Sequence, residues 1–456
     1  MTTTLFARQA LTASGWRKNV SIDIDSDGKI SAISDASVMP QNAYGVLLPS
    51  IGNLHSHSFQ RAMAGLAEKS SDKPFDDFWT WRQVMYRFLE LLTPEDVVSI
   101  SAMVQMEMLE SGYASVAEFH YLHHGPAGQR YDQVDEMSAC LFRSAMETGI
   151  GYTHLPVLYT RGGLDNRALN SGQQRFGCSM DEFEFLHSTL NTKLSELPND
   201  FVLGVAPHSL RAVSSEQLHL VSSLSNETPI HIHIAEQQNE VDEVSSYLGS
   251  PPVRWLLDNL DVNDRWCLIH ATHANNDEIR DMANANAIAG LCPITEANLG
   301  DGIFDAKSFV EQNGRFGIGS DSNVKIALSE ELRMLEVSQR LRDQRRVVLT
   351  DDTTSSNGRF LYERAALGGA TALGRNSGAI QIGTLADLVA LDDQHPMLIE
   401  LDSDTILDTW IFASSDDIVT DVWAAGRHMV KAGSHIKHSD ISIRYKDTIS
   451  KLRKAL

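Results

Sequence analysis

The chain has few of the features that mark a secreted or membrane protein. Its 456 residues include only four cysteines, Cys140, Cys178, Cys267 and Cys292, and no two of them form a CxxC pair. We therefore expect reduced, mostly buried thiols rather than a disulfide framework or a zinc ribbon. No apolar run approaches the roughly 20 residues that span a bilayer. The opening MTTTLFARQALTASG lacks a basic stretch followed by an apolar one, so we expect no signal peptide and a cytoplasmic protein.

Positive charge is also scarce. The chain has 38 Lys and Arg against 60 Asp and Glu, which gives a formal net charge of −22. This balance argues against nucleic acid and against an anionic membrane as partners. An anionic substrate would need a local cationic pocket. Internal repeats and low-complexity tracts are absent too, while the 42% hydrophobic content is typical of a globular protein with a large core.

The two ends of the chain carry short alternating stretches typical of β-strands. Residues 21–25 and 29–33 flank Asp27-Gly28, which predicts a β-hairpin. Residues 383–392 and 421–427 show similar patterns near the other end. We expect residues 1–50 and 373–456 to combine into a small β-sandwich domain, with a tail at the C-terminal end.

The middle of the chain alternates strands and helices. Helical patterns cover residues 181–197 and 330–346. With the run ending at His55, about eight strands are expected, the number that a (β/α)8 barrel needs, so residues 51–372 are expected to form this barrel. The other expected strands are 115–119, 153–159, 201–206, 230–235, 266–270, 287–291 and 316–319.

Polar residues gather where these strands end. In a barrel all the carboxyl ends of the strands point to one face, where the active site lies. This pattern is stronger than any single motif within it. The residues are His55, His57, Glu118, His120, His208, Arg211, His233, Glu236, His270 and Asp321.

Two HxH motifs point to a metal. His55 and His57 share one face of a strand because side chains alternate, and His231 and His233 repeat the spacing. A single HxH is as easily a pair of hydrogen-bonded histidines. The first motif, one histidine of the second and Asp321 together offer three nitrogens and one oxygen, a set that suits Zn²⁺ and leaves room for water.

Proton transfer needs further groups close to the metal. Glu236 follows His233 by three residues, which places a carboxylate just beyond the strand end, where it can move a proton to a leaving nitrogen. His270 could orient the attacking water. Asp321 could bind the metal and also accept a proton from that water, whose pKa a metal lowers towards roughly 7.

Several segments together resemble the amidohydrolase superfamily over nearly the whole chain. They are LHSHSFQRAMAGLAE, HIHIAEQ, IHATH, CPITEANLGDGIF, GSDS and TLADLVALD. Other segments are more specific and resemble the branch of this superfamily that acts in histidine degradation. They are FWTWRQVMYRF, AEFHYLHH, APHSLRAV and EELRMLEVSQRLRDQRR.

The resemblance implies a distorted (β/α)8 barrel with a β-sandwich, and an activity like that of the histidine-degradation branch. The implied reaction hydrolyses N-formimino-L-glutamate to N-formyl-L-glutamate and ammonia. The resemblance also implies a homodimer and one zinc per subunit. Two-metal relatives use a bridging lysine, and none occurs in residues 153–159 or 201–208, which favours one metal. The implied zinc ligands are His55, His57, His233 and Asp321, and the implied catalytic residues are Glu236, His270 and Asp321.

A small anionic substrate derived from an amino acid needs cationic partners. Arginine can bind a carboxylate through bidentate hydrogen bonds. Arg82 and Arg211 are the best placed candidates. The resemblance adds Gln60, Tyr121 and His208 as polar contacts. Arg61 is expected to be structural.

Alternative interpretations remain open. Trp79 and Trp81 would suit a deaminase of an aminopurine, a pterin or a compound like S-adenosylhomocysteine, because heterocycles stack on aromatic rings. A catalytically dead scaffold would normally have lost ligands, and every ligand is present here. His120, His123 and His124 look like a second metal cluster, but four ligands already complete one site. We expect His231, His154 and His187 to serve packing.

Overall fold

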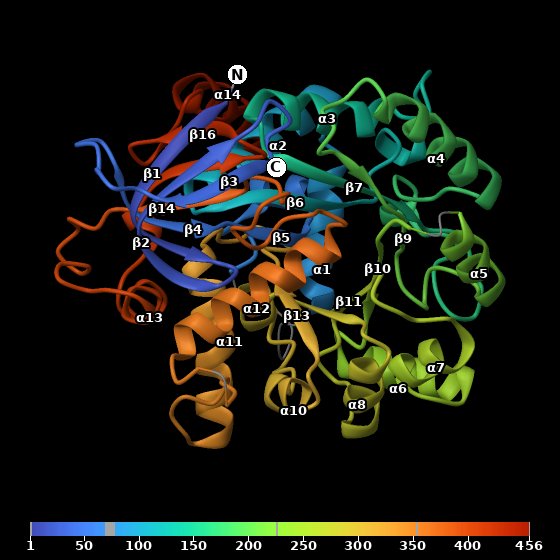
Figure 1. Cartoon of the computed structure of the whole chain (residues 1–456). Coiled ribbons are helices and arrows are strands. Elements are labelled where there is room, and N and C mark those ends of the chain that lie inside the picture. Colours follow the sequence, from blue (N-terminus) through green and yellow to red (C-terminus); the bar gives the residue numbers. More distant parts are fainter. Residues whose placement is uncertain (1, 69–77, 225–226, 353, 456) are drawn as a thin grey trace.

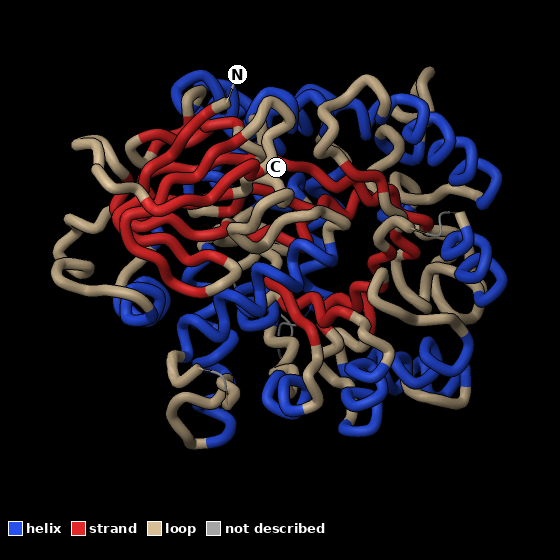
Figure 2. Tube along the Cα trace, viewed as in Figure 1, coloured by secondary structure: helices blue, strands red, loops and turns tan. Residues whose placement is uncertain are grey.

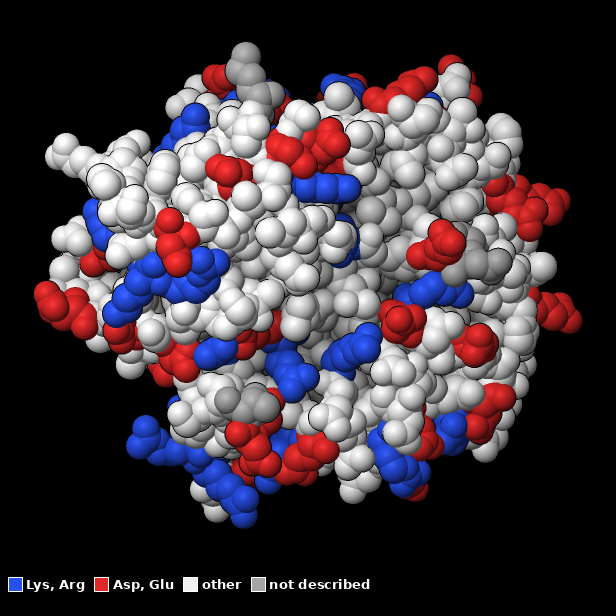
Figure 3. Space-filling view, in the orientation of Figure 1, with Lys and Arg blue, Asp and Glu red and all other residues white. Residues whose placement is uncertain are grey.

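The computed structural model describes residues 2–68, 78–224, 227–352 and 354–455. These residues form an α/β region like a TIM barrel, with a β-sheet domain on one side (Figures 1 and 2). Basic side chains lie among acidic ones on the face shown in Figure 3. Within the described ranges, no helix combines the length and the apolar character that crossing a membrane requires.

Strands from both chain ends share one continuous sheet. Its order is β17-β16-β15-β14-β4-β1-β2-β3, so blue and red strands lie side by side in Figure 1. β4 joins the two ends, because it pairs in parallel with β1 and antiparallel with β14. The predicted pairing of the ends is therefore confirmed. The bounds are β1 (Thr3–Thr12), β2 (Gly15–Ile24), β3 (Ile30–Asp35), β4 (Tyr44–Pro49), β14 (Leu388–Leu391), β15 (Val419–Ala424), β16 (Arg427–Lys431) and β17 (Ser434–His435).

The predicted hairpin is present between β2 and β3. The two strands pair antiparallel, and the backbone N–H of Gly28 donates to the carbonyl of Asp25 across the turn at 3.2 Å. Gly28 has a φ of +74°, a conformation in which a side chain would be strained. Ile22, Leu388 and Trp423 belong to the separate core of this sheet.

Two parallel sheets form the centre of the α/β region. One has the order β5-β6-β7-β8, with β9 also on β7, and the other has the order β10-β11-β12-β13. Isolated parallel bridges connect the sheets at both edges, Ser56 with Asp321 and Val205 with Ile230. The bounds are β5 (Ile51–Ser56), β6 (Tyr113–His120), β7 (Gly151–Leu158), β8 (Val202–Leu203), β9 (Ala206–Pro207), β10 (Ile230–Ile234), β11 (Trp266–His270), β12 (Ile288–Leu291) and β13 (Arg315–Ile318).

The fourth predicted strand, residues 201–206, is interrupted. It appears as the short strands β8 and β9, separated by Gly204 and Val205. The backbone is crowded here, because a Cβ on Gly204 would lie 2.6 Å from the carbonyl oxygen of Pro229. β8 and β9 both pair with β7, while Val205 between them bridges to Ile230 at the start of β10, an interruption that a hydrophobic pattern does not reveal.

Helices cover the outer side of the parallel strands (Figure 2). The two predicted helices are present as α4 and α11, and α11 ends before Gln344, which has a left-handed φ of 53°. Short 3-10 turns are η1 (Ser58–Met63), η2 (Pro126–Gly128), η3 (Ser171–Gln173) and η4 (Asp416–Ile418). The α-helices are α1 (Phe78–Leu89), α2 (Pro94–Glu110), α3 (Glu136–Thr148), α4 (Met180–Leu194), α5 (Ser215–Ser223), α6 (Gln238–Leu248), α7 (Pro252–Asn259), α8 (Asn276–Asn284), α9 (Pro293–Leu299), α10 (Ala306–Glu311), α11 (Leu328–Asp343), α12 (Asn357–Ala372), α13 (Asp404–Ala413) and α14 (His438–Ala455).

Candidate metal centre

Three of the parallel strands bring four potential ligands together. His55 lies within β5 and His57 directly after it, while His233 lies in β10. Asp321 follows β13 by three residues and pairs with Ser56 through the isolated bridge. Asp321 has a positive φ of 46°, an uncommon backbone conformation that turns the chain back towards β5.

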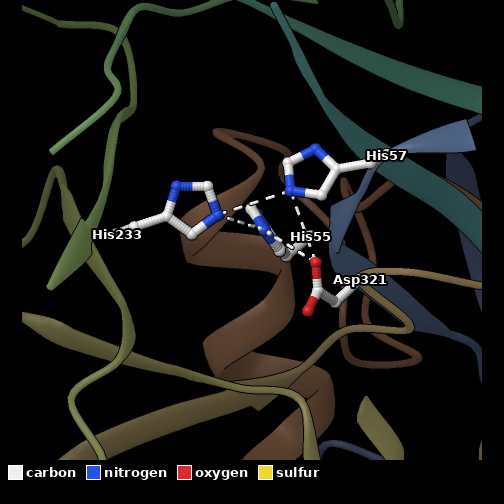
Figure 4. A group of neighbouring side chains, drawn as sticks. All are labelled: His55, His57, His233 and Asp321. Carbon is white, nitrogen blue, oxygen red and sulfur yellow. Dashed lines mark hydrogen bonds and ion pairs between the residues drawn. The ribbon is translucent and has the colours of Figure 1, made fainter. Parts of the chain in front are cut away.

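The ligand atoms of this group converge on one point (Figure 4). His233 Nε2 lies 3.1 Å from His55 Nε2 and 3.4 Å from His57 Nε2. Asp321 Oδ1 lies 3.4 Å from His55 Nε2 and 3.3 Å from His57 Nε2. All four atoms lie within 4.8 Å of one another. The structure thus brings together the four ligands that the sequence predicts.

The hydrogen bonds of these histidines fit a metal site. The Nδ1 atom of His57 lies 3.0 Å from the carbonyl oxygen of Phe119, and that of His233 lies 3.2 Å from the carbonyl oxygen of His208. Each Nδ1 must carry the proton to donate to a carbonyl, which leaves a lone pair on Nε2. Lone pairs that face one another and a carboxylate repel unless a cation lies between them. The donor set therefore fits a divalent ion.

Burial keeps these rings neutral. His55 is fully buried, and burial lowers its pKa to about 3. Burial also lowers the pKa of His57 and of His233. For Asp321, burial alone would raise the pKa, but the neighbouring histidines, with the hydrogen bond of His55 foremost, together outweigh burial and bring the pKa below its ordinary value. Neutral imidazoles and an ionised carboxylate are the forms that bind metals.

Glu236 and His270 lie next to the ligand group. His270 Nε2 is 3.8 Å from Glu236 Oε1 and 3.9 Å from Asp321 Oδ2. Burial raises the pKa of Glu236 to about 7, against the opposing charge of His270. Burial alone would lower the pKa of His270, but neighbouring carboxylates, Glu236 foremost, raise it to about 10. A carboxyl group that titrates near neutral pH is suited to accept and return a proton.

A third carboxyl group near His270 is absent from the sequence-based assignment. Glu296 Oε1 lies 3.2 Å from His270 Nδ1 and accepts a hydrogen bond from the Cys292 backbone N–H at 2.8 Å. Glu296 therefore orients the imidazole from behind. Its position within CPITEANLG was the available signal, but nothing in the spacing links that glutamate to His270.

A cavity opens onto the ligand group. Glu236 and His270 line it, as do both arginines that the sequence predicts for substrate binding. Of the pair of tryptophans, Trp81 lines this cavity, and the side chain of Trp79 lies outside the described part of the structure. The lining residues are His57, Gln60, Trp81, Arg82, Met85, Tyr121, Phe176, His208, Arg211, His233, Glu236, His270, Leu299 and Asp321.

The predicted polar contacts also lie in this cavity, with Gln60 and Tyr121 in contact. Gln60 Nε2 donates to the hydroxyl of Tyr121 at 2.8 Å, while Oε1 of Gln60 is buried and has no hydrogen-bond partner among the described residues. His208 is buried, and burial together with the charge of Arg211 holds its pKa well below the ordinary value. These groups can accept or donate hydrogen bonds to a bound molecule.

The two arginines are held differently. Arg82 Nη2 donates to the hydroxyl of Tyr159 at 3.1 Å. Arg211 Nη2 lies 4.0 Å from Glu240 Oε2, and its buried Nε has no hydrogen-bond partner among the described residues. Two guanidinium groups in one cavity supply the local positive charge that an anion needs in this acidic chain.

The other histidines lie outside the ligand group. The Nε2 atom of His123 lies 2.8 Å from the carbonyl oxygen of Val157, and that of His124 lies 2.7 Å from the carbonyl oxygen of Gly177. His231 is buried with Nε2 2.8 Å from the carbonyl oxygen of Ala372. His120 ends β6, where its ring contacts those of His123 and His154, and it is not one of the four converging ligands. These contacts agree with the prediction that the HxH partner His231 and the FHYLHH cluster are not ligands.

Arg61 has a structural explanation. Its guanidinium donates to both carboxylate oxygens of Glu107 at 2.8 Å. It also donates to the carbonyls of Asn323 and Val324 at 3.0 and 2.9 Å. Arg61 therefore ties α2 to the loop that follows Asp321, which agrees with its predicted structural role.

Comparisons with protein families agree with this geometry. Residues 46–429 match the model described as the Amidohydrolase family. Residues 2–43 match the model described as Formimidoylglutamate deiminase HutF, N-terminal domain. Together the two matches cover most of the sheet domain and the whole region that carries the metal centre.

Individual relatives show the same likeness. The formimidoylglutamate deiminase of Pseudomonas aeruginosa is 46% identical over 94% of this chain and 95% of its own. A 5-methylthioadenosine/S-adenosylhomocysteine deaminase of Pyrococcus abyssi is 26% identical over 78% of this chain and 76% of its own.

Solved structures extend the likeness to the whole fold. The crystal structure of an amidohydrolase from Brucella melitensis is 43% identical, with a TM-score of 0.94 over 98% of this chain and 99% of its own. An adenosine deaminase from Xanthomonas campestris, solved with bound zinc, shares the fold at 21% identity, with a TM-score of 0.82 over 99% of this chain and 98% of its own. The chain belongs to the amidohydrolase family and, within it, to the formimidoylglutamate deiminases.

Proposed function

We propose that the protein hydrolyses N-formimino-L-glutamate to N-formyl-L-glutamate and ammonia. Membership of the family makes the chain a hydrolase that acts on C–N bonds. The substrate carries two carboxylates and a cationic formimino group. Water replaces the terminal nitrogen at the formimino carbon, and that nitrogen leaves as ammonia, so the atoms of water are divided between the new carbonyl group and the departing nitrogen.

One observation carries this proposal. A single cavity joins the His and Asp group and Glu236 to both Arg82 and Arg211. Charge-assisted bonds to carboxylates are stronger than neutral ones, and two arginines suit a molecule with two carboxylates. Because both arginines line the same cavity as Glu236 and Asp321, they can bind the carboxylates of a substrate whose formimino group lies at these acidic residues.

We propose zinc as the cofactor, one ion per subunit. His55, His57, His233 and Asp321 would hold it, since three imidazole nitrogens and one carboxylate oxygen with a position left for water is a common catalytic zinc set. Bound zinc supplies a Lewis acid and makes water nucleophilic near neutral pH.

The chain's own residues handle the protons. Asp321 and His270 face the same end of the cavity and orient the attacking water. Glu236, with a pKa of about 7, takes a proton there and delivers it to the departing nitrogen. Glu296 keeps the His270 ring in place through Nδ1.

A deaminase of an aminopurine, a pterin or a compound like S-adenosylhomocysteine is the second candidate. The deaminase of Pyrococcus abyssi and the position of Trp81 in the cavity favour it. Two cationic side chains in the same cavity argue for the dicarboxylate instead.

Ammonia release from four compounds tests the proposal. Purified zinc-loaded protein is given N-formimino-L-glutamate, N-formimino-L-aspartate, guanine or S-adenosylhomocysteine at equal concentration. We expect the fastest release from the glutamate compound. Release from guanine or S-adenosylhomocysteine with none from N-formimino-L-glutamate would replace the first candidate with the second.

Two broader features are also proposed. We infer that the parallel strands close into a distorted (β/α)8 barrel, supported by the bridges at both edges, and that the sheet of the chain ends folds over its own core as a β-sandwich. We propose a homodimer as well, on the strength of the family resemblance, and light scattering in solution tests it.

A further inference from the structure

The edge between β5 and β13 carries three of the four ligands. The Asp321 N–H donates to the His55 carbonyl, and the His57 N–H donates to the Asp321 carbonyl, both at 2.9 Å. Because β5 and β13 meet here only through an isolated bridge in the assigned pairing, the ligand spacing depends on what else holds this edge together.

Buried side chains form a chain of hydrogen bonds across this edge. Asn53 Nδ2 donates to Ser320 Oγ at 2.6 Å, and Ser320 Oγ donates to Asn323 Oδ1 at 2.6 Å. Asn323 Nδ2 then donates to Ser56 Oγ at 3.1 Å, and Ser56 Oγ donates to Glu118 Oε2 at 2.8 Å. All five residues are at most 2% exposed.

Neighbouring backbone groups set the direction of this chain of hydrogen bonds. Asn53 Oδ1 accepts from the Ser320 N–H at 3.1 Å, which fixes which amide atom of Asn53 donates. Asn323 Nδ2 also donates to the Asp321 carbonyl at 3.1 Å, which fixes the amide of Asn323 in the same way. Each bond in a chain of one direction polarises the next and strengthens it.

Glu118 is the end point of this chain. Its Oε1 accepts from both the N–H and the Oγ of Ser58 at 2.7 Å, in addition to the bond from Ser56 to Oε2. The two serines flank His57 in sequence. A carboxylate can accept from all these donors at once, whereas an amide of the same size cannot. Glu118 therefore holds both backbone neighbours of a ligand.

We propose that Glu118 is a positioning residue of the metal centre, which ends a hydrogen-bond chain that holds the ligand-bearing ends of β5 and β13 together. Glu118 is neither one of the four ligands nor among the residues that line the cavity, so it acts through Ser56 and Ser58, and through Ser56 on Asn323. The proposal rests on the proposed metal at this site and is independent of which substrate is used.

Zinc affinity of Glu118→Gln tests the proposal. The amide places a donor against the donors of Ser56 or Ser58, so the chain loses its end point. Loss of such an outer partner typically weakens metal binding, and we expect a fall of roughly 10- to 100-fold in Zn²⁺ affinity. Competition with a chromophoric chelator measures it, with no substrate present. The visible absorption of the Co²⁺-loaded protein should also change, because it reports ligand geometry.

Glu336→Gln is the matched control. Glu336 is also buried and accepts from two backbone N–H groups, those of Val348 and Leu349, both at 2.8 Å, and from Arg340 Nε at 2.6 Å. It lies on α11, outside the hydrogen-bond chain. We expect lower stability with unchanged Zn²⁺ affinity. Equal loss of Zn²⁺ affinity in both variants would overturn the proposal, because general destabilisation would then explain it.

Ser56→Ala provides a second, smaller change. It cuts the link between Asn323 and Glu118 but keeps the carboxylate and its bonds from Ser58. We expect Ser56→Ala to bind Zn²⁺ more weakly than the wild-type protein. In the double variant Ser56→Ala/Glu118→Gln, the loss of Zn²⁺ affinity should be smaller than the two single losses combined, because both changes act on one chain of hydrogen bonds. Unchanged Zn²⁺ affinity in Ser56→Ala would overturn the proposal, even where Glu118→Gln fails to fold. If the wild-type protein bound no divalent ion, the proposed metal centre itself would be overturned.

Discussion

The two edges at which the parallel sheets meet are built differently. At the edge between β5 and β13, buried amide, hydroxyl and carboxyl side chains cross between the strands. At the edge between β9 and β10, backbone groups make the contacts, apart from His233 Nδ1, which lies 3.2 Å from the His208 carbonyl oxygen. The Val205 N–H donates to Pro229, the His231 N–H to Val205 and the His233 N–H to His208, at 3.0 to 3.1 Å.

The two edges also supply different residues to the site. The polar edge supplies His55, His57 and Asp321, which are three of the four ligands. The backbone-paired edge supplies only His233 to the ligand group, but His208 and Arg211 follow it in the cavity wall. We infer that one edge is organised around the metal and the other around the substrate.

Removing a ligand from either edge should have the largest effect. In His57→Ala and in His233→Ala, only three of the four ligands remain, so we expect loss of bound metal and of activity by more than the roughly 10²–10⁴-fold that one acid–base group supplies. Metal content by elemental analysis and ammonia release measure the two effects. If the edges differ as inferred, His57→Ala should also lower thermal stability more, because Ser56 and Ser58 on either side of His57 both donate to Glu118.

A His233→Ala protein that keeps stoichiometric zinc and full turnover would show that the backbone-paired edge contributes no ligand. The variant His231→Ala is the matched control. His231 belongs to the same strand but bonds the Ala372 carbonyl, away from the ligand group. We expect it to keep its metal.

Glu236→Gln should separate chemistry from metal binding. Glu236 follows the backbone-paired edge and lies 3.8 Å from His270, but it is not one of the four ligands. We expect kcat to fall roughly 10²- to 10⁴-fold, because glutamine cannot carry a proton. Zinc content should stay at one per chain. Near-normal turnover of N-formimino-L-glutamate would rule out Glu236 as the proton carrier.

Much of the site was predictable because its residues end strands. The alternation rule placed His55 and His57 on one face, and the parallel arrangement brought His233 and Asp321 to the same end of the strands. The regular elements α4 and α11 were also predictable from their hydrophobic patterns. The helices follow from local sequence periodicity alone, whereas the choice of these four ligands also rested on the resemblance to the amidohydrolase superfamily.

The supporting contacts were not predictable in the same way. Glu118 was placed correctly at the end of β6, but its bonds reach Ser56 and Ser58, about sixty residues earlier in the chain. Asn53 and Ser320 are 267 residues apart in sequence and meet only because the strands come together. Arg61 stood next to Gln60 without explanation until its contacts with Asn323 and Val324 were visible. Side-chain contacts between such distant residues depend on the tertiary structure, which the pattern of a single sequence does not reveal.

Two glycines allow the smallest and most direct comparison of the edges. A Cβ on Gly319 would lie 2.8 Å from the backbone nitrogen and the Cβ of His55, at the polar edge. A Cβ on Gly204 would lie 2.6 Å from the Pro229 carbonyl oxygen, at the backbone-paired edge. Each site is a close approach of two strands, so alanine must push them apart in both cases.

We expect Gly319→Ala and Gly204→Ala to lower the free energy of unfolding by similar amounts, about 1–3 kcal/mol each, as overpacking does. Urea unfolding of the metal-free proteins measures this effect. Only Gly319→Ala should also weaken Zn²⁺ binding, because the strand that it displaces carries His55 and the loop that it displaces carries Asp321. Equal Zn²⁺ affinity in the two variants would mean that the spacing of β5 and β13 does not set the metal geometry, and the distinction between the edges would then be one of composition alone.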